Sequence, residues 1–440
     1  MASIADVLRR SLGRLTGPIT RHPAFRRLLA GQVGFAFGAQ AGALAVPTIA
    51  IVGLHASPMD VGILAALPWL PAPILGMPIG VLVDRLPRRP LMIGSEAGRW
   101  LVLIALTTLV ISRTETLYHL YVASLVLGLI GTVYDIAYQS FMPSTLSEDE
   151  LLDANSVVDV AKTPALVGGP ALGGALISGI GPASALVAYC AGSLASLLSL
   201  RGIQTREPVG RPEKRSLLND LVAGVRLVLG NPTLRTIATA GAISNLGAFM
   251  FSAVSLVFAY RDLGLSPILV GSVLAVGNLG YLIGAAAAPM WVSELGLGRT
   301  LALSQLFLAI SLFVTPLSLL AAPVAVFAIS QLLQNLTSEV FGLNQVSLRQ
   351  AITPRELQGR MNATVRVGIV GAVPVGTLLG GYLGTTLGVV ETMLIGAAIS
   401  LAAPLFILSA PLIRLRRIEV QPVVPLALVE VAETLVAEPV

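Results

Sequence analysis

The chain alternates between long apolar runs and short polar breaks. Each run has about 20 residues or more, the length that a helix rising about 1.5 Å per residue needs to cross a hydrocarbon layer of about 30 Å. Strands of a membrane barrel would be about half as long and would alternate in polarity, which these runs do not. The pattern therefore predicts an all-α membrane protein with twelve transmembrane helices, at roughly 25–53, 61–83, 91–111, 117–141, 157–179, 182–202, 233–259, 267–290, 299–320, 323–346, 364–387 and 390–413.

Composition supports this interpretation and excludes several classes of function. Of the 440 residues, 55% are hydrophobic and only 12% charged, too few charges to cover the surface of a soluble protein of this size. Cys190 is the only cysteine, so we expect neither a disulfide framework nor a cysteine metal site. No nucleotide-binding glycine-lysine loop is present. We expect no cofactor, no metal, no nucleic-acid partner and no enzymatic activity.

Basic residues gather in the breaks on one side of the predicted membrane. They precede the first run and follow the second, sixth, tenth and twelfth runs, whereas the other breaks hold isolated charges such as Arg113 and Arg261. The positive-inside rule then predicts a multi-pass protein of the cell membrane with both termini in the cytoplasm.

The break at residues 203–232 is the longest inside the chain and divides six runs from six. It contains Pro208, Gly210 and Pro212, followed by an amphipathic segment from Leu217 to Leu229, which predicts a helix on the membrane surface. The expected parts are an N-terminal tail (1–24), a six-helix bundle (25–203), a linker (204–232), a second bundle (233–413) and a C-terminal tail (414–440).

Three blocks of the first bundle recur in order in the second. The shifts are nearly constant (266 − 57 = 209, 294 − 84 = 210 and 362 − 155 = 207) for Ser57-Pro58 and Ser266-Pro267, Asp84 and Glu294, and Asn155 and Asn362. We infer a duplication. An even number of spans in each copy keeps the two bundles in the same orientation, related by an axis normal to the membrane.

Two motifs carry a family resemblance. Gly80 to Arg89 is a basic turn with one carboxylate, containing Asp84, Arg85, Arg88 and Arg89, and Gly169-Pro170-Ala171-Leu172-Gly173-Gly174 lies in the fifth run. The first resembles the loop 2/3 signature of the major facilitator superfamily, with Pro87 in place of the usual glycine. The second is similar to the core of the motif associated with antiporters, although Ala165 stands where that motif has glycine.

Within that superfamily the chain looks most like bacterial multidrug, macrolide and siderophore exporters. The likeness includes Asp135 with Gln139 and Pro143, Ala154-Asn155 and Gly359-Arg360-Met361-Asn362. The resemblance implies two bundles that rock against each other. It also implies that Asp84 meets the positive N-terminal end of the eleventh helix and that the loop locks the outward-facing state.

Seven ionisable residues fall within the runs or near their ends, all on the cytoplasmic half: Glu96, Arg99, Asp135, Asp159, Lys162, Glu339 and Arg366. Facing lipid, each would cost about 2.5 to 3.5 kcal/mol, so we expect them to pair or to face water. Asp135 and Glu339 are candidate proton sites. The alternative is a permanent ion pair of Asp135 with Arg99, and of Glu339 with Arg366.

The other charges are candidates for a cytoplasmic gate. Glu96 and Arg99 are spaced i, i+3 and can pair on one helix face; Asp159 and Lys162 share that spacing. Arg366 corresponds to Asp159 in the repeat, since 366 − 159 = 207.

Polar residues in otherwise apolar runs are candidate substrate contacts, each with the alternative of a hydrogen bond between helices: Gln32, Gln40, Tyr134, Tyr138, Asn245, Asn278, Tyr281, Gln334 and Asn335. The favoured function is secondary active, proton-coupled efflux of an amphipathic small molecule by alternating access. An importer or uniporter on the same fold, and a non-transporting receptor or scaffold, remain alternatives. We expect a monomer in contact with membrane lipid.

Overall fold

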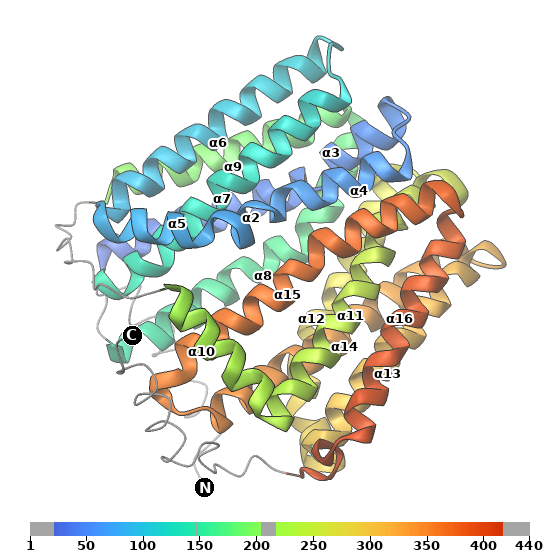
Figure 1. Cartoon of the computed structure of the whole chain (residues 1–440). Coiled ribbons are helices and arrows are strands. Elements are labelled where there is room, and N and C mark those ends of the chain that lie inside the picture. Colours follow the sequence, from blue (N-terminus) through green and yellow to red (C-terminus); the bar gives the residue numbers. More distant parts are fainter. Residues whose placement is uncertain (1–21, 146–147, 204–216, 417–440) are drawn as a thin grey trace, which may run out of the picture.

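A computed structural model describes residues 22–145, 148–203 and 217–416, and within these ranges every regular element is a helix (Figure 1). The first half contains α2 (Pro23–Gly42), α3 (Ala45–Thr48), η1 (Ile49–Gly53), α4 (Pro58–Ala66), η2 (Leu67–Trp69), α5 (Pro71–Arg85), α6 (Arg88–Ile111), α7 (Leu117–Thr145), α8 (Glu148–Gly179) and α9 (Pro182–Arg201). The second half contains α10 (Leu217–Gly230), α11 (Pro232–Val257), η3 (Phe258–Asp262), α12 (Pro267–Leu295), α13 (Leu297–Val314), η4 (Thr315–Leu319), α14 (Pro323–Ile352), α15 (Arg355–Thr386), α16 (Val389–Ser409) and η5 (Pro411–Arg414).

The expected all-helical membrane fold is confirmed. Ten helical runs of the described chain are long and apolar enough to cross a membrane. The two other predicted spans fall in α14 and α15, which have 30 and 32 residues but contain more polar side chains, so their crossing stays a prediction.

Local sequence explains where many of these helices begin. Ser57 caps α4 by accepting a hydrogen bond from the Asp60 amide, while the Asp60 carboxylate accepts one from the Ser57 amide. Such a reciprocal box, with proline in the first turn, defines a helix start. The corresponding Ser266-Pro267 pair begins α12 in the second half.

The helices form two bundles joined through two seams. In one seam α4 packs against α15, and in the other α8 packs against α12. We call the end with His22, Arg201 and Arg416 the termini end, and the end with His55 and Gly388 the opposite end. The bundles approach each other near α3 at the opposite end and diverge toward the termini end (Figure 1).

Two expectations about the breaks are refined. The stretch from Gly80 to Arg89 is mostly helical, because α5 continues to Arg85 and α6 begins at Arg88. Only Leu86 and Pro87 are extended. The expected amphipathic helix is present as α10, which buries Val228 against Met361 and Val365 of α15. The predicted tails and residues 204–216 lie outside the described part of the chain, apart from residues 22–24 and 414–416.

Candidate transport site

A buried ion pair lies at the centre of the first bundle. Glu96 and Arg99, both on α6, contact each other and are 0% and 4% exposed. The Arg99 guanidinium lies 4.4 Å from the Phe35 ring centroid and 5.3 Å from that of Tyr134. Ser193 of α9 donates a hydrogen bond of 2.9 Å to the Glu96 carboxylate. Pairing, stacking and hydrogen bonding together compensate the desolvation of two charges.

This arrangement overturns the alternative in which Asp135 pairs with Arg99. Arg99 turns toward Glu96 and two aromatic rings, whereas Asp135 is exposed on the other face of α7. For two candidate substrate contacts, the structure shows the alternative, a hydrogen bond between helices. Gln32 and Tyr134 are each 5% exposed, and the Gln32 amide donates a hydrogen bond of 2.7 Å to the Tyr134 hydroxyl. They join α2 to α7 and are closed to a substrate in this conformation.

Four other candidates form a group between α7 and α8. Lys162 lies within electrostatic reach of Asp159 and Asp135, and its ammonium nitrogen is 5.9 Å from the Tyr138 ring centroid. The Tyr138 ring stacks on Tyr134, with centroids 6.2 Å apart. The Tyr138 hydroxyl is buried without a hydrogen-bond partner in the described structure. Asp159 and Asp135 are exposed. The group therefore includes charged side chains that a ligand can reach.

The second bundle presents a polar row on α14. Gln334 donates hydrogen bonds to Thr315 and Ser330, at 3.2 and 3.0 Å, and Asn335 donates one of 3.3 Å to Asn278 of α12. The Asn278 amide in turn donates one of 2.7 Å to the Leu166 carbonyl of α8. Asn278 therefore joins the two halves.

Glu339 lies one turn further along α14 and is half-buried. It is close enough to Tyr281 of α12 for electrostatic interaction, and its β-carbon lies against Gly284. Among the described side chains it has neither an ion-pair nor a hydrogen-bond partner. The side chain of its expected partner, Arg366, lies outside the described part. Glu339 is thus a carboxylate in a helix bundle with no described cation beside it.

Three more candidates are half-buried and make no side-chain hydrogen bond within the described structure: Gln40 of α2, Asn245 of α11 and Tyr281 of α12. With Tyr138 of α7, they supply unsatisfied polar groups from four helices and both bundles. Buried polar groups normally have partners, so half-buried groups that have none among the described residues are suited to a ligand or water.

Glycines close the two seams toward the opposite end. A β-carbon at Gly62 would lie 2.8 Å from the Gly381 α-carbon, and one at Gly174 would lie 3.1 Å from the Gly271 α-carbon. These glycines correspond in the repeat, since 271 − 62 = 209 and 381 − 174 = 207. Two other glycines of the antiporter-like motif pack within the first bundle, Gly173 against Ala41 and Gly169 against Gln40, whereas the Pro170 carbonyl lies in the seam beside Gly271. The motif is built for close helix contact.

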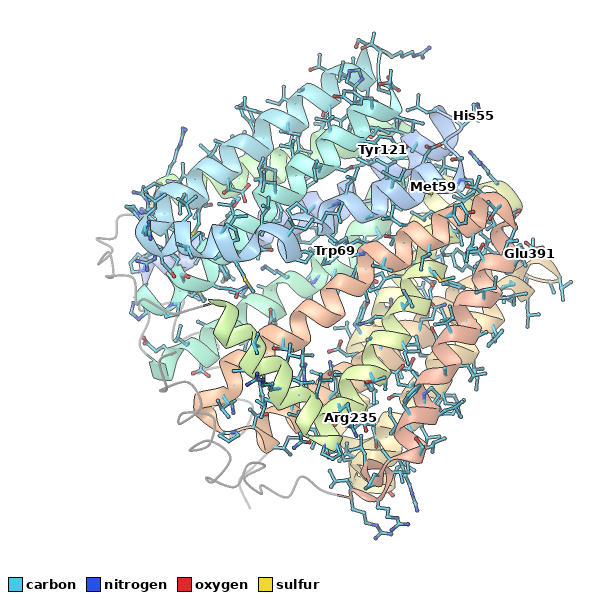
Figure 2. The ribbon with its side chains drawn as sticks, in the orientation of Figure 1. His55, Met59, Trp69, Tyr121, Arg235 and Glu391 are labelled. Atoms are coloured by element: carbon cyan, nitrogen blue, oxygen red, sulfur yellow. The ribbon has the colours of Figure 1, made fainter. Side chains whose placement is uncertain are left out.

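Hydrogen bonds reinforce this closed end. The Arg261 guanidinium donates to the carbonyls of Ala56 at 2.8 Å and Ile51 at 3.4 Å, and the hydroxyls of Tyr260 and Thr48 are 2.7 Å apart. The Met59 amide donates to Thr385 at 2.9 Å, and the Ile268 amide to Ser178 at the same distance. His55 and Met59 mark this region in Figure 2.

The four charged residues of the predicted conformational lock lie on two different helices. Asp84 and Arg85 are exposed at the end of α5, while Arg88 and Arg89 are half-buried at the start of α6. Arg89 donates to the carbonyls of Leu200 and Arg201, at 3.2 and 2.9 Å. Arginine at a helix C-terminus satisfies carbonyls that lack an intrahelical partner.

The sequence interpretation missed a neutral network in the second bundle. Gln305 is 2% exposed and accepts a hydrogen bond of 2.5 Å from Ser244, whose carbonyl accepts one from Ser400. Gln305 corresponds to Glu96, since 305 − 96 = 209, and Ser400 to Ser193, since 400 − 193 = 207. The repeat shift was therefore the sequence signal that could have identified Gln305 and Ser400. At these corresponding positions the first bundle has the charged Glu96 and the second the neutral Gln305.

The fold and these polar clusters define a polytopic membrane transporter rather than an enzyme. The chain belongs to the major facilitator superfamily, and its residues 17–439 match the family described as transmembrane secretion effector.

Relatives of known name support this assignment. The enterobactin exporter EntS of Escherichia coli O1:K1 / APEC is 26% identical over 371 residues, which cover 82% of this chain and 86% of EntS. YfiS of Bacillus subtilis (strain 168), described as an uncharacterized MFS-type transporter, is 28% identical over 263 residues. That match covers 59% of this chain and 62% of YfiS, so the chain spans less than two thirds of that relative's length.

Solved structures share the fold. A bacterial homologue of the iron transporter ferroportin in an inward-facing state has a TM-score of 0.69 at 18% identity, covering 88% of this chain and 98% of that one. A structure of such a homologue in an outward-facing state has a TM-score of 0.55 at 20% identity, covering 87% and 97%.

Proposed function

We propose that this protein is a secondary active transporter that exports an amphipathic small molecule in exchange for protons. The observation that carries the proposal is a set of polar side chains on α2, α7, α11 and α12, together with Glu339 of α14, that have no hydrogen-bond or ion-pair partner among the described side chains. Hydroxyls, an amide pair and a carboxylate among abundant Leu, Val and Ala suit a ligand that is partly apolar and forms hydrogen bonds. EntS, which matches most of this chain, is named as an exporter.

We place the termini end in the cytoplasm. Exposed arginines of the described chain gather there, including Arg26, Arg85, Arg201, Arg299 and Arg416, and the positive-inside rule assigns such an end to the cytoplasm. The divergence of the bundles toward that end then corresponds to an inward-facing state. The higher TM-score with the inward-facing than with the outward-facing ferroportin homologue supports this interpretation. One chain contains both bundles, so a monomer suffices.

Glu339 is the first candidate for coupling, with Asp135 the second. An ionised carboxylate within a spanning helix costs about 2.5 to 3.5 kcal/mol, and one charge crossing 100 mV releases about 2.3 kcal/mol. Taking up a proton from one side and releasing it to the other therefore involves energies of the same order as the gradient supplies. Asp159, Lys162 and Arg366 are proposed to pair across the termini end when the bundles close there.

Transport in oriented proteoliposomes tests this function. In a strain without its own efflux pumps, a substrate screen first identifies an exported compound. We then expect Glu339→Gln to abolish proton-driven efflux while the protein folds and still binds the compound. Glu391→Gln, which removes an exposed carboxylate at the opposite end, should leave efflux intact.

Three results would contradict the proposal. Unchanged efflux in both Glu339→Gln and Asp135→Asn excludes them as coupling sites. Gradient-driven accumulation in the cytoplasmic direction indicates an importer. Absence of any transported compound, with Gln40, Tyr138, Asn245 and Tyr281 all replaceable by apolar residues, indicates a non-transporting protein.

A further inference from the structure

A cavity that none of the candidate transport residues lines lies at the termini end of the second bundle. It has a volume of about 740 Å³ and lies between α12 and α14. Ala285, Pro289 and Leu343 form apolar parts of its wall, while Arg299 and Arg416 reach it from the start of α13 and from the segment after η5. The cavity thus combines an apolar wall with two cationic side chains, and it lies at the end of the bundle, where the spanning helices reach water.

The segment after η5 is fastened to this cavity by main-chain hydrogen bonds. The Leu297 amide donates to the Arg416 carbonyl at 3.2 Å, and the Gly298 amide to the Leu415 carbonyl at 2.9 Å. Gly296 has φ +82°, and a β-carbon there would lie 3.1 Å from the Arg416 α-carbon. The backbone of Arg416 is thus held against the turn that precedes α13.

Comparison of the two halves shows that these main-chain hydrogen bonds leave the Arg299 side chain without a structural role in joining the helix ends. Arg299 corresponds to Arg89, since 299 − 89 = 210. In the first half the Arg89 side chain ties the start of α6 to the end of α9. In the second half the main chain makes the equivalent tie. Neither Arg299 nor Arg416 has an ion-pair or hydrogen-bond partner in the described structure, the nearby Glu294 included.

The other polar groups of the wall are already engaged. The Ser293 hydroxyl donates to the Met290 carbonyl, the Ser347 hydroxyl to the Leu343 carbonyl and the Asn344 amide to the Val340 carbonyl. Among the described side chains of the wall, the charged donors without a partner are therefore the two guanidinium groups. With the Glu294 carboxylate they give the cavity a net charge of about +1, matching one phosphodiester.

We propose that this cavity binds the head group of an anionic phospholipid, with its phosphate between Arg299 and Arg416 and its acyl chain along Leu343 and Pro289. Basic pockets between spanning helices on the cytoplasmic side are suited to anionic head groups. Recognition through guanidinium charge alone selects lipids by charge rather than by head-group structure. This inference concerns a lipid site and does not depend on export.

Native mass spectrometry of the delipidated full-length protein tests it, with titration of phosphatidylglycerol and phosphatidylethanolamine. We expect one phosphatidylglycerol to bind more tightly than phosphatidylethanolamine. Arg299→Gln and Arg416→Gln should each weaken that binding about fivefold, and the double variant roughly 25-fold. Arg414→Gln, an exposed neighbour that does not line the cavity, is the matched control and should bind as the wild type does.

Folding and the source of the anion are tested separately. The thermal unfolding midpoint of each variant should match that of the wild type, because no described partner is lost. Equal binding of the two lipids, or unaltered phosphatidylglycerol binding in the double variant, overturns the proposal. Displacement of phosphatidylglycerol by millimolar inorganic phosphate also overturns it, since the cavity would then be a site for soluble anions.

Discussion

The seam between α8 and α12 allows a single methyl group to test the proposed cycle. In the present conformation a β-carbon at Gly174 would lie 3.1 Å from the α-carbons of Gly271 and Ile268. Main-chain atoms cannot yield as a flexible side chain can, so Gly174→Ala must push the two helices apart. Overpacking of this kind costs about 1 to 3 kcal/mol.

That cost falls only on the state in which this seam is closed. In the proposed alternative state the bundles separate at the opposite end, and the added methyl group has room. We therefore expect the ratio of the two populations to shift by about 5- to 150-fold toward the state open at the opposite end.

Distances between spin labels measure this shift. Thr114→Cys and Leu387→Cys place labels at the opposite end of each bundle, in a background carrying Cys190→Ser. Gly168→Ala, on the same helix with nothing within 4 Å of the added β-carbon, should leave the distances unchanged. Gly173→Ala clashes within the first bundle, against Ala41, and should lower the unfolding midpoint without lengthening the distances. The reasoning fails if Gly174→Ala reproduces the wild-type distances or if Gly168→Ala shifts them equally.

Three further perturbations address other contacts. Arg261→Gln loses two hydrogen bonds between the halves and should shift the ratio of the two populations about tenfold toward the state open at the opposite end. The same spin-label distances measure this shift. An equal effect of Arg113→Gln would show that net charge is the cause instead. Arg99→Leu leaves Glu96 buried without a cation and should destabilise the protein by about 3 to 5 kcal/mol, measured by thermal unfolding; a midpoint equal to that of the wild type would contradict the ion pair. Asp84→Asn should slow transport without changing the unfolding midpoint, because the Asp84 carboxylate is exposed here; transport at the wild-type rate would reduce the turn to a topological role.

Local features were predictable from the sequence. Apolar length gave the helices, and all twelve predicted runs fall almost entirely within helical segments of the described chain. The i, i+3 spacing of Glu96 and Arg99 led to their pair, because helix geometry alone brings such residues together. The amphipathic pattern at 217–229 likewise predicted α10.

Contacts between distant helices were not predictable in the same way. Depth in the membrane suggested that Asp135 pairs with Arg99, but depth says nothing of the direction in which each side chain leaves its helix. Rotation about the helix axis places Arg99 toward Phe35 and Asp135 toward Lys162. Gln305 was missed for a related reason. A single amide in an apolar run is not informative by itself, and its importance is seen only when its position is compared with that of Glu96 in the repeat.

The exchange of glycines across the two seams has a consequence for the origin of the molecule. Gly62 meets Gly381, and Gly174 meets Gly271, so the repeat maps one contact onto the other. A contact that maps onto itself in this way is isologous, as in a twofold homodimer. A six-helix ancestor carrying the two glycines would thus have paired with a second copy of itself before the genes fused. After fusion each seam became free to change alone, and Arg261, which has Val52 as its counterpart (261 − 52 = 209), shows that the two copies have already diverged at their common boundary.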